Sequence, residues 1–152
     1  MASSTIYQLV WQTRRIFQHL RVISDELLES TGINTSQRAV LETLYPDQAI
    51  SVPRIAQQLT VSRQHIQVIV NELQLLKLVK TVENPAHKRS LHIQRTEKGR
   101  SSFEQIKQRE AGLLNEIASE FSGDEMGAAA ETLRNLRDHL NREVISKLER
   151  DE

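Results

Sequence analysis

The sequence predicts a mainly helical fold that carries one small β-hairpin. Apolar residues recur at three- and four-residue spacing through most of the chain, which is the period of an amphipathic helix. Residues 79–83 and 91–95 differ, because they form short runs typical of strands on either side of a polar, basic tip. Many charged residues (26%) and few aromatic ones (4%) also suit a helical protein. We therefore expect six helices and a two-stranded wing within one domain, 1–152.

Capping residues bound the first two predicted helices. The first covers about 5–30, and Gly32 can take the left-handed conformation that ends a helix. Thr35 or Ser36 is predicted to cap the second, which runs to Tyr45. Its expected buried residues are Val40, Leu41 and Leu44.

A tight turn joins the third predicted helix to the fourth. Ser51 is expected to cap the third helix, with Pro53 in its first turn, where the missing N–H costs nothing. Ser62 is predicted to cap the fourth, which runs to about Leu76. The fourth helix should bury Ile66, Ile69, Val70 and Leu73. Its outward side should carry Arg63, Gln64, Gln67, Asn71 and Gln74, with His65 near the edge.

A hairpin and two helices complete the predicted fold. Residues 79–83 and 91–95 should pair around a tip at 84–90. A fifth helix is expected over roughly 97–121 and a sixth over 124–148. The sixth has apolar residues at nearly heptad spacing, which is typical of helix–helix packing.

The net charge of zero hides an uneven distribution. Residues 51–100 hold nine Lys and Arg against three Asp and Glu, a net charge of +6, whereas 1–50 carry −1 and 101–152 carry −5. A basic middle between acidic flanks predicts a localised face that binds a polyanion. Chance clustering on a solvated surface is the alternative, and the order of the elements argues against it.

Composition excludes several classes of protein. The chain has no cysteine, which excludes a disulfide framework, a thiolate zinc site and a cysteine redox sensor. The histidines lack metal-type spacing, and no catalytic or phosphate-binding motif stands out, so we expect no metal, no cofactor and no enzyme. No apolar run approaches the roughly 20 residues that cross a bilayer, and the N-terminus lacks a secretory pattern. A soluble, cytoplasmic protein is therefore expected.

The hairpin tip reads Asn84-Pro85-Ala86-His87-Lys88-Arg89-Ser90, and Arg95-Thr96-Glu97-Lys98-Gly99 follows. This pattern resembles the MarR family of winged helix–turn–helix transcriptional regulators. The family's wing typically reads Asn-Pro-x-Asp-Arg-Arg-Ser, followed by apolar strand residues and Leu-Thr-x-x-Gly. The chain length, the leading helix and the two closing helices also fit the resemblance, which is strongest from Ser36 to Gly99.

Four positions depart from the family pattern. His87 and Lys88 stand where the family has Asp and Arg, and that Asp normally helps to brace the wing. Arg95 stands where the family has Leu. The family often has Gly at the position of Lys77, so we expect either a positive φ there or a different turn.

The resemblance implies a DNA-binding lobe at 34–99 between dimerisation helices at 1–33 and 100–152. The fourth helix would enter the major groove, where Arg can pair with guanine and Gln with adenine. The candidate residues on this helix are Ser62, Arg63, Gln64, His65 and Gln67. An ordinary solvated helix face is the alternative.

Further contacts are expected from the wing and from helix starts. By analogy with the family, Arg89 would enter the minor groove, with Lys88 and His87 near phosphates. Backbone contacts are expected from Ser36, Gln37, Arg38 and Arg54. A flexible turn that happens to be basic is the alternative for the wing.

The resemblance also implies a homodimer on a palindromic double-stranded operator, acting as a repressor that occludes a promoter. Intramolecular packing alone is the alternative for the terminal helices. Family members often bind small aromatic acids, for which the candidate lining residues are Trp11, Arg14, Arg15, His19 and Tyr45. Core aromatics and surface arginines explain these residues equally well, so no effector is assigned. The rival function is a winged-helix protein-interaction module, like an anti-repressor, with weak or no DNA binding.

Overall fold

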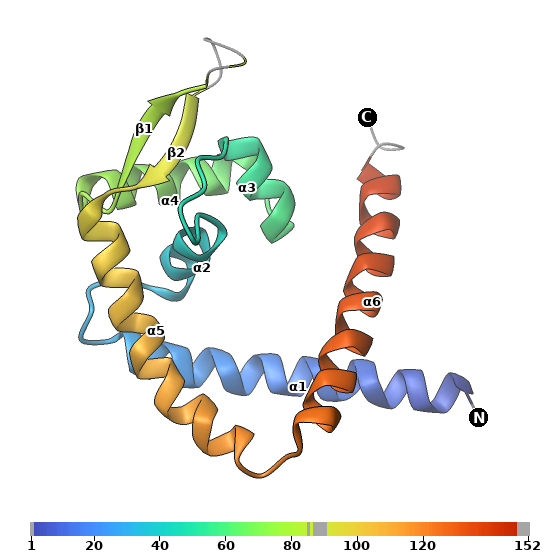
Figure 1. The fold of residues 1–152 in the computed structure, drawn as a ribbon. Helices are drawn as coiled ribbons and strands as arrows, with labels where there is room; N and C mark the ends of the chain where they lie inside the picture. The colour runs from blue at the N-terminus through green and yellow to red at the C-terminus, as the bar shows by residue number, and fades with distance from the viewer. Residues whose placement is uncertain (1, 85, 87–90, 149–152) are drawn as a thin grey trace. The chain divides into compact units, whose positions relative to one another are not determined.

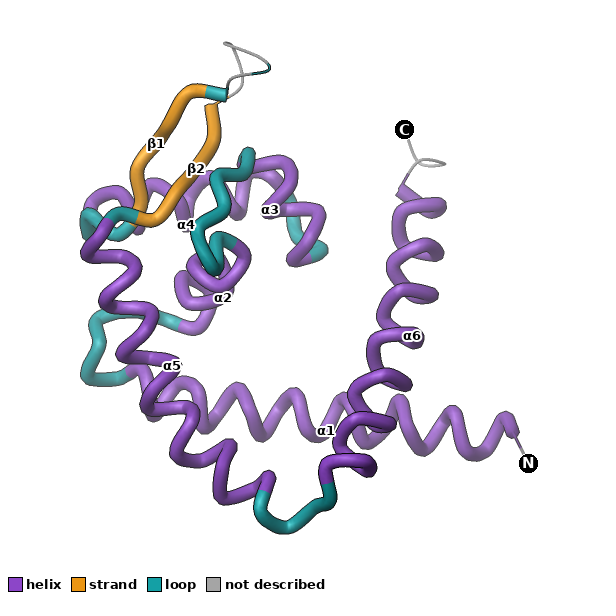
Figure 2. The backbone as a smooth tube through the Cα atoms, viewed as in Figure 1, coloured by secondary structure: helices purple, strands orange, loops and turns teal. Residues whose placement is uncertain are grey.

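The computed structural model describes residues 2–84, 86 and 91–148, with side chains described between 4 and 144 in those ranges (Figure 1). This part of the chain consists of six helices and one antiparallel pair of strands (Figure 2). The strands β1 (Val79–Glu83) and β2 (Leu91–Arg95) have the predicted bounds. The helices are α1 (Ala2–Leu28), α2 (Thr35–Thr43), α3 (Val52–Leu59), α4 (Arg63–Leu75), α5 (Glu97–Ala118) and α6 (Gly123–Leu148). The predicted mainly helical fold with a small wing is confirmed.

The chain divides into two compact units, 1–110 and 111–152. The first holds α1 to α4, the wing and the larger part of α5, and the second holds the end of α5 and α6. None of the helices in the described ranges is long and apolar enough to cross a membrane.

One hydrophobic core stabilises the first unit. Its side chains come from α2, α3, α4, both strands and α5, with Leu28 from the end of α1. The contribution of α4 is Ile66, Ile69, Val70 and Leu73, each at most 5% exposed. Burying an apolar side chain of this size stabilises the fold by about 1.5–3 kcal/mol. The predicted inner face of α4 is therefore confirmed, and the opposite face is left to solvent.

The cap of α2 lies one residue earlier than predicted. Asn34 takes this place instead of Thr35 or Ser36, because its Oδ1 accepts a hydrogen bond from the Gln37 N–H at 2.8 Å. In return, Gln37 Oε1 accepts from the Asn34 N–H at 3.1 Å, which completes a capping box. The Thr35 hydroxyl donates to Asp25 of α1 instead.

Two residues that are not glycine have positive φ, and they flank α4. Thr60 precedes the helix with φ 56°, and Lys77 follows it with φ 61°. After α4, the Leu78 N–H bonds back to the Leu73 carbonyl at 2.9 Å, which is the pattern of a Schellman end. Of the two alternatives left open for Lys77, the structure has the positive φ. Each such residue costs roughly 1–2 kcal/mol, because its Cβ crowds a carbonyl oxygen.

The wing pairs with a third segment that the sequence does not predict. Strands β1 and β2 lie side by side next to α4, in a register that runs from Val79 opposite Arg95 to Glu83 opposite Leu91 (Figure 1). Ile50, just before α3, forms an isolated bridge to Ile93 of β2. The Ile50 N–H donates to the Ile93 oxygen, with the N and O atoms 3.1 Å apart, and the Ile93 N–H donates to the Ile50 oxygen at 2.8 Å. This bridge fixes the entry into α3 against the base of the wing.

Three consecutive carbonyls after α4 accept hydrogen bonds from the start of α5. Lys98 Nζ donates to the Leu76 oxygen at 2.9 Å. The Thr96 hydroxyl donates to the Lys77 oxygen at 2.7 Å, and the Thr96 N–H donates to the Leu78 oxygen at 3.0 Å. Two residues at the start of α5 therefore bind the whole turn that leaves α4.

Gly99 makes this arrangement possible. A Cβ at this position would lie 1.9 Å from the Leu78 oxygen and 2.9 Å from its carbonyl carbon. These atoms are backbone and cannot rotate away, so only glycine lets α5 approach the chain this closely. The Gly99 N–H also donates to the Thr96 hydroxyl at 3.0 Å.

We predict that Gly99→Ala lowers the free energy of unfolding by about 3 kcal/mol or slightly more, since the new methyl group overlaps backbone atoms. The matched control is Gly112→Ala, also in α5, where a Cβ would meet nothing within 4 Å. The control should gain about 0.5–1 kcal/mol from helix propensity. Urea unfolding at one fixed protein concentration measures both variants, and equal stabilities would refute the predicted overlap.

Candidate nucleic-acid interface

The amino end of α4 presents the polar residues that the sequence predicts for a DNA-reading helix. The Ser62 hydroxyl accepts a hydrogen bond from the His65 N–H at 3.1 Å and caps the helix as expected. Arg63, Gln64, His65 and Gln67 are all exposed. Because the core residues of α4 lie on its other side, these polar side chains can meet a ligand without disturbing the core.

Asn71 orients Gln67. The Gln67 Nε2 donates a hydrogen bond to Asn71 Oδ1 at 2.9 Å. Residues four apart lie on the same side of a helix, so the bond runs along the outer surface of α4. It leaves Gln67 with one amide N–H and the Oε1 acceptor for a ligand.

Two of the four residues predicted at helix starts face solvent. Ser36 in α2 and Arg54 in α3 are exposed. Arg54 Nη1 donates to Gln57 Oε1 at 2.8 Å, one turn along the same helix. A guanidinium has five N–H donors, so Arg54 can still bind a phosphate.

The other two, Gln37 and Arg38, bind partners inside the protein. Gln37 is only 7% exposed, and its Nε2 donates to Glu72 of α4 at 2.8 Å. Arg38 makes two parallel contacts with Glu110 of α5, at 2.5 and 2.7 Å, and a third with Glu42 at 2.9 Å. The hydrogen bonds to Glu110 are the largest cause that raises the pKa of Arg38 above its usual value. We therefore leave both residues out of the candidate interface.

The predicted wing-tip residues His87, Lys88 and Arg89 lie outside the described residues. What is described is the base of the wing, where the Asn84 Oδ1 accepts a hydrogen bond from the Ala86 N–H at 2.9 Å. This is the local bond by which asparagine favours a turn.

Arg95, at the base of the wing, is buried. Its side chain is 2% exposed, it donates to the Pro46 carbonyl, and it lies 3.5 Å from the Asp47 carboxylate. Its guanidinium carbon lies 5.3 Å from the centre of the Tyr45 ring and 5.4 Å from that of Phe103. The Nε and Nη1 atoms have no protein partner, which costs free energy in a buried site. Arg95 thereby ties the loop after α2 to the wing.

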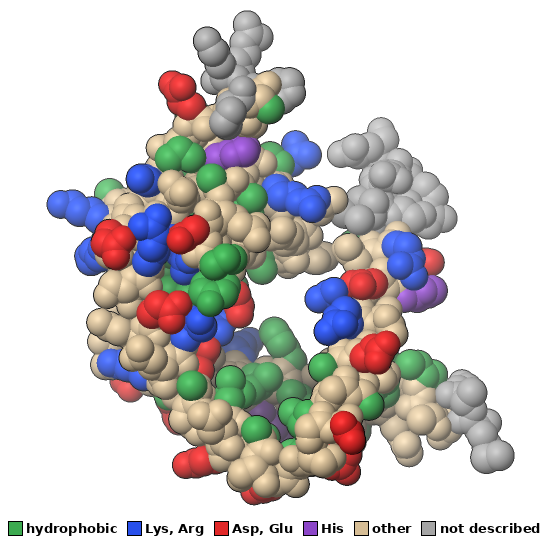
Figure 3. Space-filling model, in the orientation of Figure 1, with side chains coloured by type: hydrophobic (Ala, Val, Ile, Leu, Met, Phe, Trp, Pro, Cys, Tyr) green, Lys and Arg blue, Asp and Glu red, His purple; other side chains and the backbone are tan. Residues whose placement is uncertain are grey.

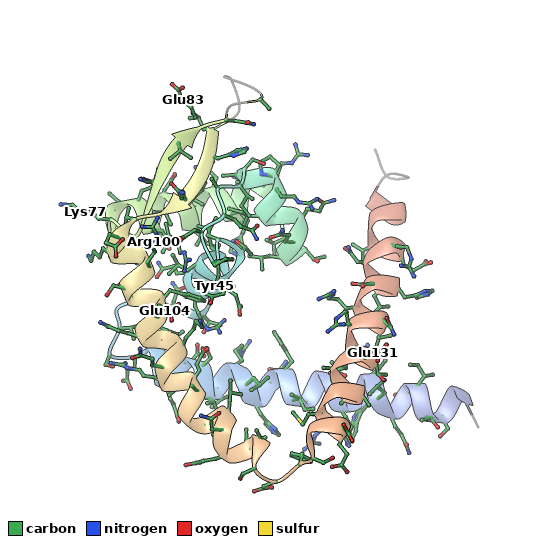
Figure 4. All side chains as sticks on the ribbon, in the orientation of Figure 1. Tyr45, Lys77, Glu83, Arg100, Glu104 and Glu131 are labelled. Atoms are coloured by element: carbon green, nitrogen blue, oxygen red, sulfur yellow. The ribbon has the colours of Figure 1, made fainter. Side chains whose placement is uncertain are left out.

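Side chains of α5 contact the same loop. Arg100 Nε donates to Asp47 Oδ1 at 2.7 Å, and this bond is the largest cause that raises the pKa of Arg100. Lys107 Nζ donates to the Tyr45 hydroxyl at 3.1 Å, and this bond is the largest cause that raises the pKa of Lys107. Figure 4 shows Tyr45 and Arg100 beside α5. The α2–α3 loop is thus held by one helix and by the wing at once.

Basic side chains lie on the exposed surface of this lobe. Figure 3 shows Lys and Arg around α4 and the start of α5, with Asp and Glu among them. The exposed cations described here include Arg54, Arg63, Lys77, Lys80 and Lys98. Together with the net charge of +6 in residues 51–100, they suit a polyanionic ligand.

The model of the MarR family matches residues 31–90, which run from the start of the lobe through the wing. The chain belongs to the MarR family. Curated relatives include uncharacterized proteins of Mycobacterium tuberculosis and Mycobacterium bovis, each 32% identical over 123 residues, covering 81% of both chains.

Solved structures share the MarR fold over nearly the whole chain. A MarR family transcription regulator matches with a TM-score of 0.77 and 24% identity, covering 99% of this chain and 97% of its own. FabT of Streptococcus pneumoniae, solved in complex with DNA, matches with a TM-score of 0.72 and 19% identity, covering 90% and 98%. MarR of E. coli matches with a TM-score of 0.71 and 21% identity, covering 84% and 96%. The protein therefore has the winged-helix fold of MarR family regulators.

Two of the effector candidates, Trp11 and Tyr45, contact different neighbours in this MarR family chain. Arg15 lies over the Trp11 ring at 4.9 Å, on exposed α1, and Tyr45 packs against Phe103 with ring centres 5.9 Å apart. A depression of about 370 Å³ lies elsewhere, at the junction of α1 and α2. It is lined by Asp25, Leu28, Glu29, Gly32, Ile33, Asn34 and Gln37. Within the described ranges, no group of three His, Asp or Glu side chains could hold a metal ion.

We predict that Arg38→Ala destabilises the lobe without weakening phosphate contacts. Losing the bonds to Glu110 should lower the free energy of unfolding by about 1–3 kcal/mol. The slope of log DNA affinity against log salt concentration should stay the same, because Arg38 makes no phosphate contact in the candidate interface.

Arg54→Ala is the matched comparison, with the opposite pattern. Its stability should stay within about 0.5 kcal/mol of the unaltered protein. For Arg54→Ala, the slope of log affinity against log salt concentration should be shallower by about one for each protomer bound. A shallower slope for Arg38→Ala would return Arg38 to the interface.

Proposed function

We propose that this MarR family protein is a homodimeric repressor that binds a palindromic double-stranded operator and occludes a promoter. The observation that carries the proposal is the division of α4 into a buried side and an exposed side that is mostly polar. A helix held this firmly can present side chains to base edges in the major groove. The exposed Arg63, Gln64 and Gln67 have the chemistry that recognises guanine and adenine there.

Phosphate contacts would supply most of the affinity and base contacts the specificity. Ser36, Ser62 and Arg54 are the described residues proposed for phosphates. His65 is exposed in the first turn of α4 and is proposed to lie at the edge of the groove. From the sequence pattern alone, Lys88, Arg89 and His87 are proposed for the flanking backbone and minor groove.

Exposed apolar side chains support a dimer. Those on α1 are Ile6, Tyr7, Trp11, Ile16, Phe17, Leu20 and Val22, each at least 46% exposed. Those between 111 and 144 are Leu114, Ile117, Phe121, Met126, Leu133 and Leu140, each at least 40% exposed. Apolar surface on this scale is typical of an interface between subunits. A symmetric dimer would also supply the two reading helices that a palindrome requires.

We predict that Arg63→Ala weakens binding to the specific operator by about 1–3 kcal/mol and leaves binding to scrambled DNA nearly unchanged. Lys88→Ala should weaken binding to both duplexes alike, because a phosphate contact carries no sequence information. Fluorescence anisotropy with an operator selected from a random duplex pool, and with a scrambled copy, measures both.

Equal losses on both duplexes for Arg63→Ala would exclude a base-reading role for this residue. DNA binding that is undetectable or insensitive to salt would refute the proposed function. That result would favour the rival function, a winged-helix module that binds a protein partner.

We predict that the double variant Phe17→Glu/Leu133→Glu is monomeric at micromolar concentration. Each substitution would bury an unpaired carboxylate in the proposed interface, at a cost of several kcal/mol in each subunit. Sedimentation equilibrium gives the mass directly. The control is Leu75→Glu, because Leu75 is 83% exposed but lies on α4, which is not one of the proposed interface helices. A dimeric double variant would contradict the assignment of this interface.

A further inference from the structure

The most outward line of α4 contains an apolar residue in its middle. Successive residues of an α-helix turn by about 100°. With the four core residues of α4 as the inner direction, the residues within roughly 30° of the opposite direction are Gln64, Val68, Asn71 and Leu75. Arg63 and Gln67 lie further to one side. The centre of the proposed reading face is therefore Gln64, Val68 and Asn71.

Val68 is an apolar residue that lies outside the hydrophobic core. It is 52% exposed. Its neighbours along the outward line are the amides Gln64, one turn earlier, and Asn71, one turn later. Asn71 is itself engaged with Gln67 at 2.9 Å, so the polar side chains around Val68 are partly ordered.

Thymine is the base whose chemistry fits this valine. In the major groove, thymine alone presents a methyl group, and small apolar side chains contact it. Glutamine pairs with the adenine N6 and N7 atoms in the same groove. Val68, one turn after Gln64, can therefore contact a thymine methyl group while Gln64 forms hydrogen bonds with a neighbouring adenine.

We propose that Val68 determines specificity by contacting the 5-methyl group of a thymine in each operator half-site, next to a base contacted by Gln64. This inference rests on the proposed DNA-binding function and adds a residue and a base to it. Uracil differs from thymine only in lacking this methyl group, so it removes the contact while keeping every hydrogen bond.

The test begins with selection of duplexes from a random pool by the full-length protein. Each thymine of the resulting consensus is then replaced by deoxyuridine, one at a time, in one half-site. At one thymine, the substitution should weaken binding about fourfold, which is the effect of removing one buried methyl group. Deoxyuridine at the other thymines, outside the reach of Val68, serves as the control on the DNA side.

The same duplexes are then titrated with two variants. With Val68→Ala, the difference between thymine and uracil at the sensitive position should disappear. With Leu75→Ala, which removes an exposed side chain two turns further along the same line, the fourfold difference should persist. Val68 is half exposed, so Val68→Ala should keep its urea unfolding midpoint, and a loss of binding cannot then be ascribed to unfolding.

Three results would overturn the inference while leaving DNA binding intact: a consensus without thymine, no position sensitive to uracil, or an unchanged uracil effect in Val68→Ala. A pool that returns no consensus at all would instead overturn the proposed function itself, and the role of Val68 with it.

Discussion

The absence of a side chain at Gly99 lets the start of α5 lie directly against the Leu78 carbonyl, and the rest of the winged helix–turn–helix depends on that contact. Because α5 comes this close, Thr96 and Lys98 can bind the three carbonyls that follow α4. Strand β1 begins immediately after these carbonyls, and β2 ends immediately before Thr96. The base of the wing is thereby closed at the same place where α4 ends. A shift at this point would move the helix and the wing together.

A second set of contacts joins the start of α3, and the loop before it, to the base of the wing. The Ile50–Ile93 bridge fixes the entry into α3, and buried Arg95 binds the loop before it through the Pro46 carbonyl. The ion pair between Arg38 and Glu110 joins α2 to α5. Each of these contacts uses α5 or the strand that leads into it. The α5 helix therefore serves as the support on which α2, α3 and the wing are placed.

The sequence predicts the features that depend on neighbouring residues. Local spacing and a family pattern were enough to infer the bounds of both strands, the Ser62 cap and the inner face of α4. They left the positive φ of Lys77 as one of two alternatives. Long-range contacts were missed, because nothing near Arg38 in the sequence indicates Glu110, 72 residues away. The same limit applies to Gln37, whose partner Glu72 lies on another helix. Exposed polar residues at helix starts look alike in a sequence, and only the fold separates those that bind the protein from those free to bind DNA.

The left-handed residues at the two ends of α4 have a consequence for how this regulator can evolve. Thr60 and Lys77 each hold a conformation that glycine would adopt without strain, and neither lies on the outward line of the helix. Most substitutions that change a protein's function also reduce its stability, and proteins tolerate only a limited loss. A single change to glycine at either position would restore stability without altering the side chains proposed to read bases. The helix proposed to determine operator choice is thus bounded by two sites of latent evolvability, through which new specificities become accessible.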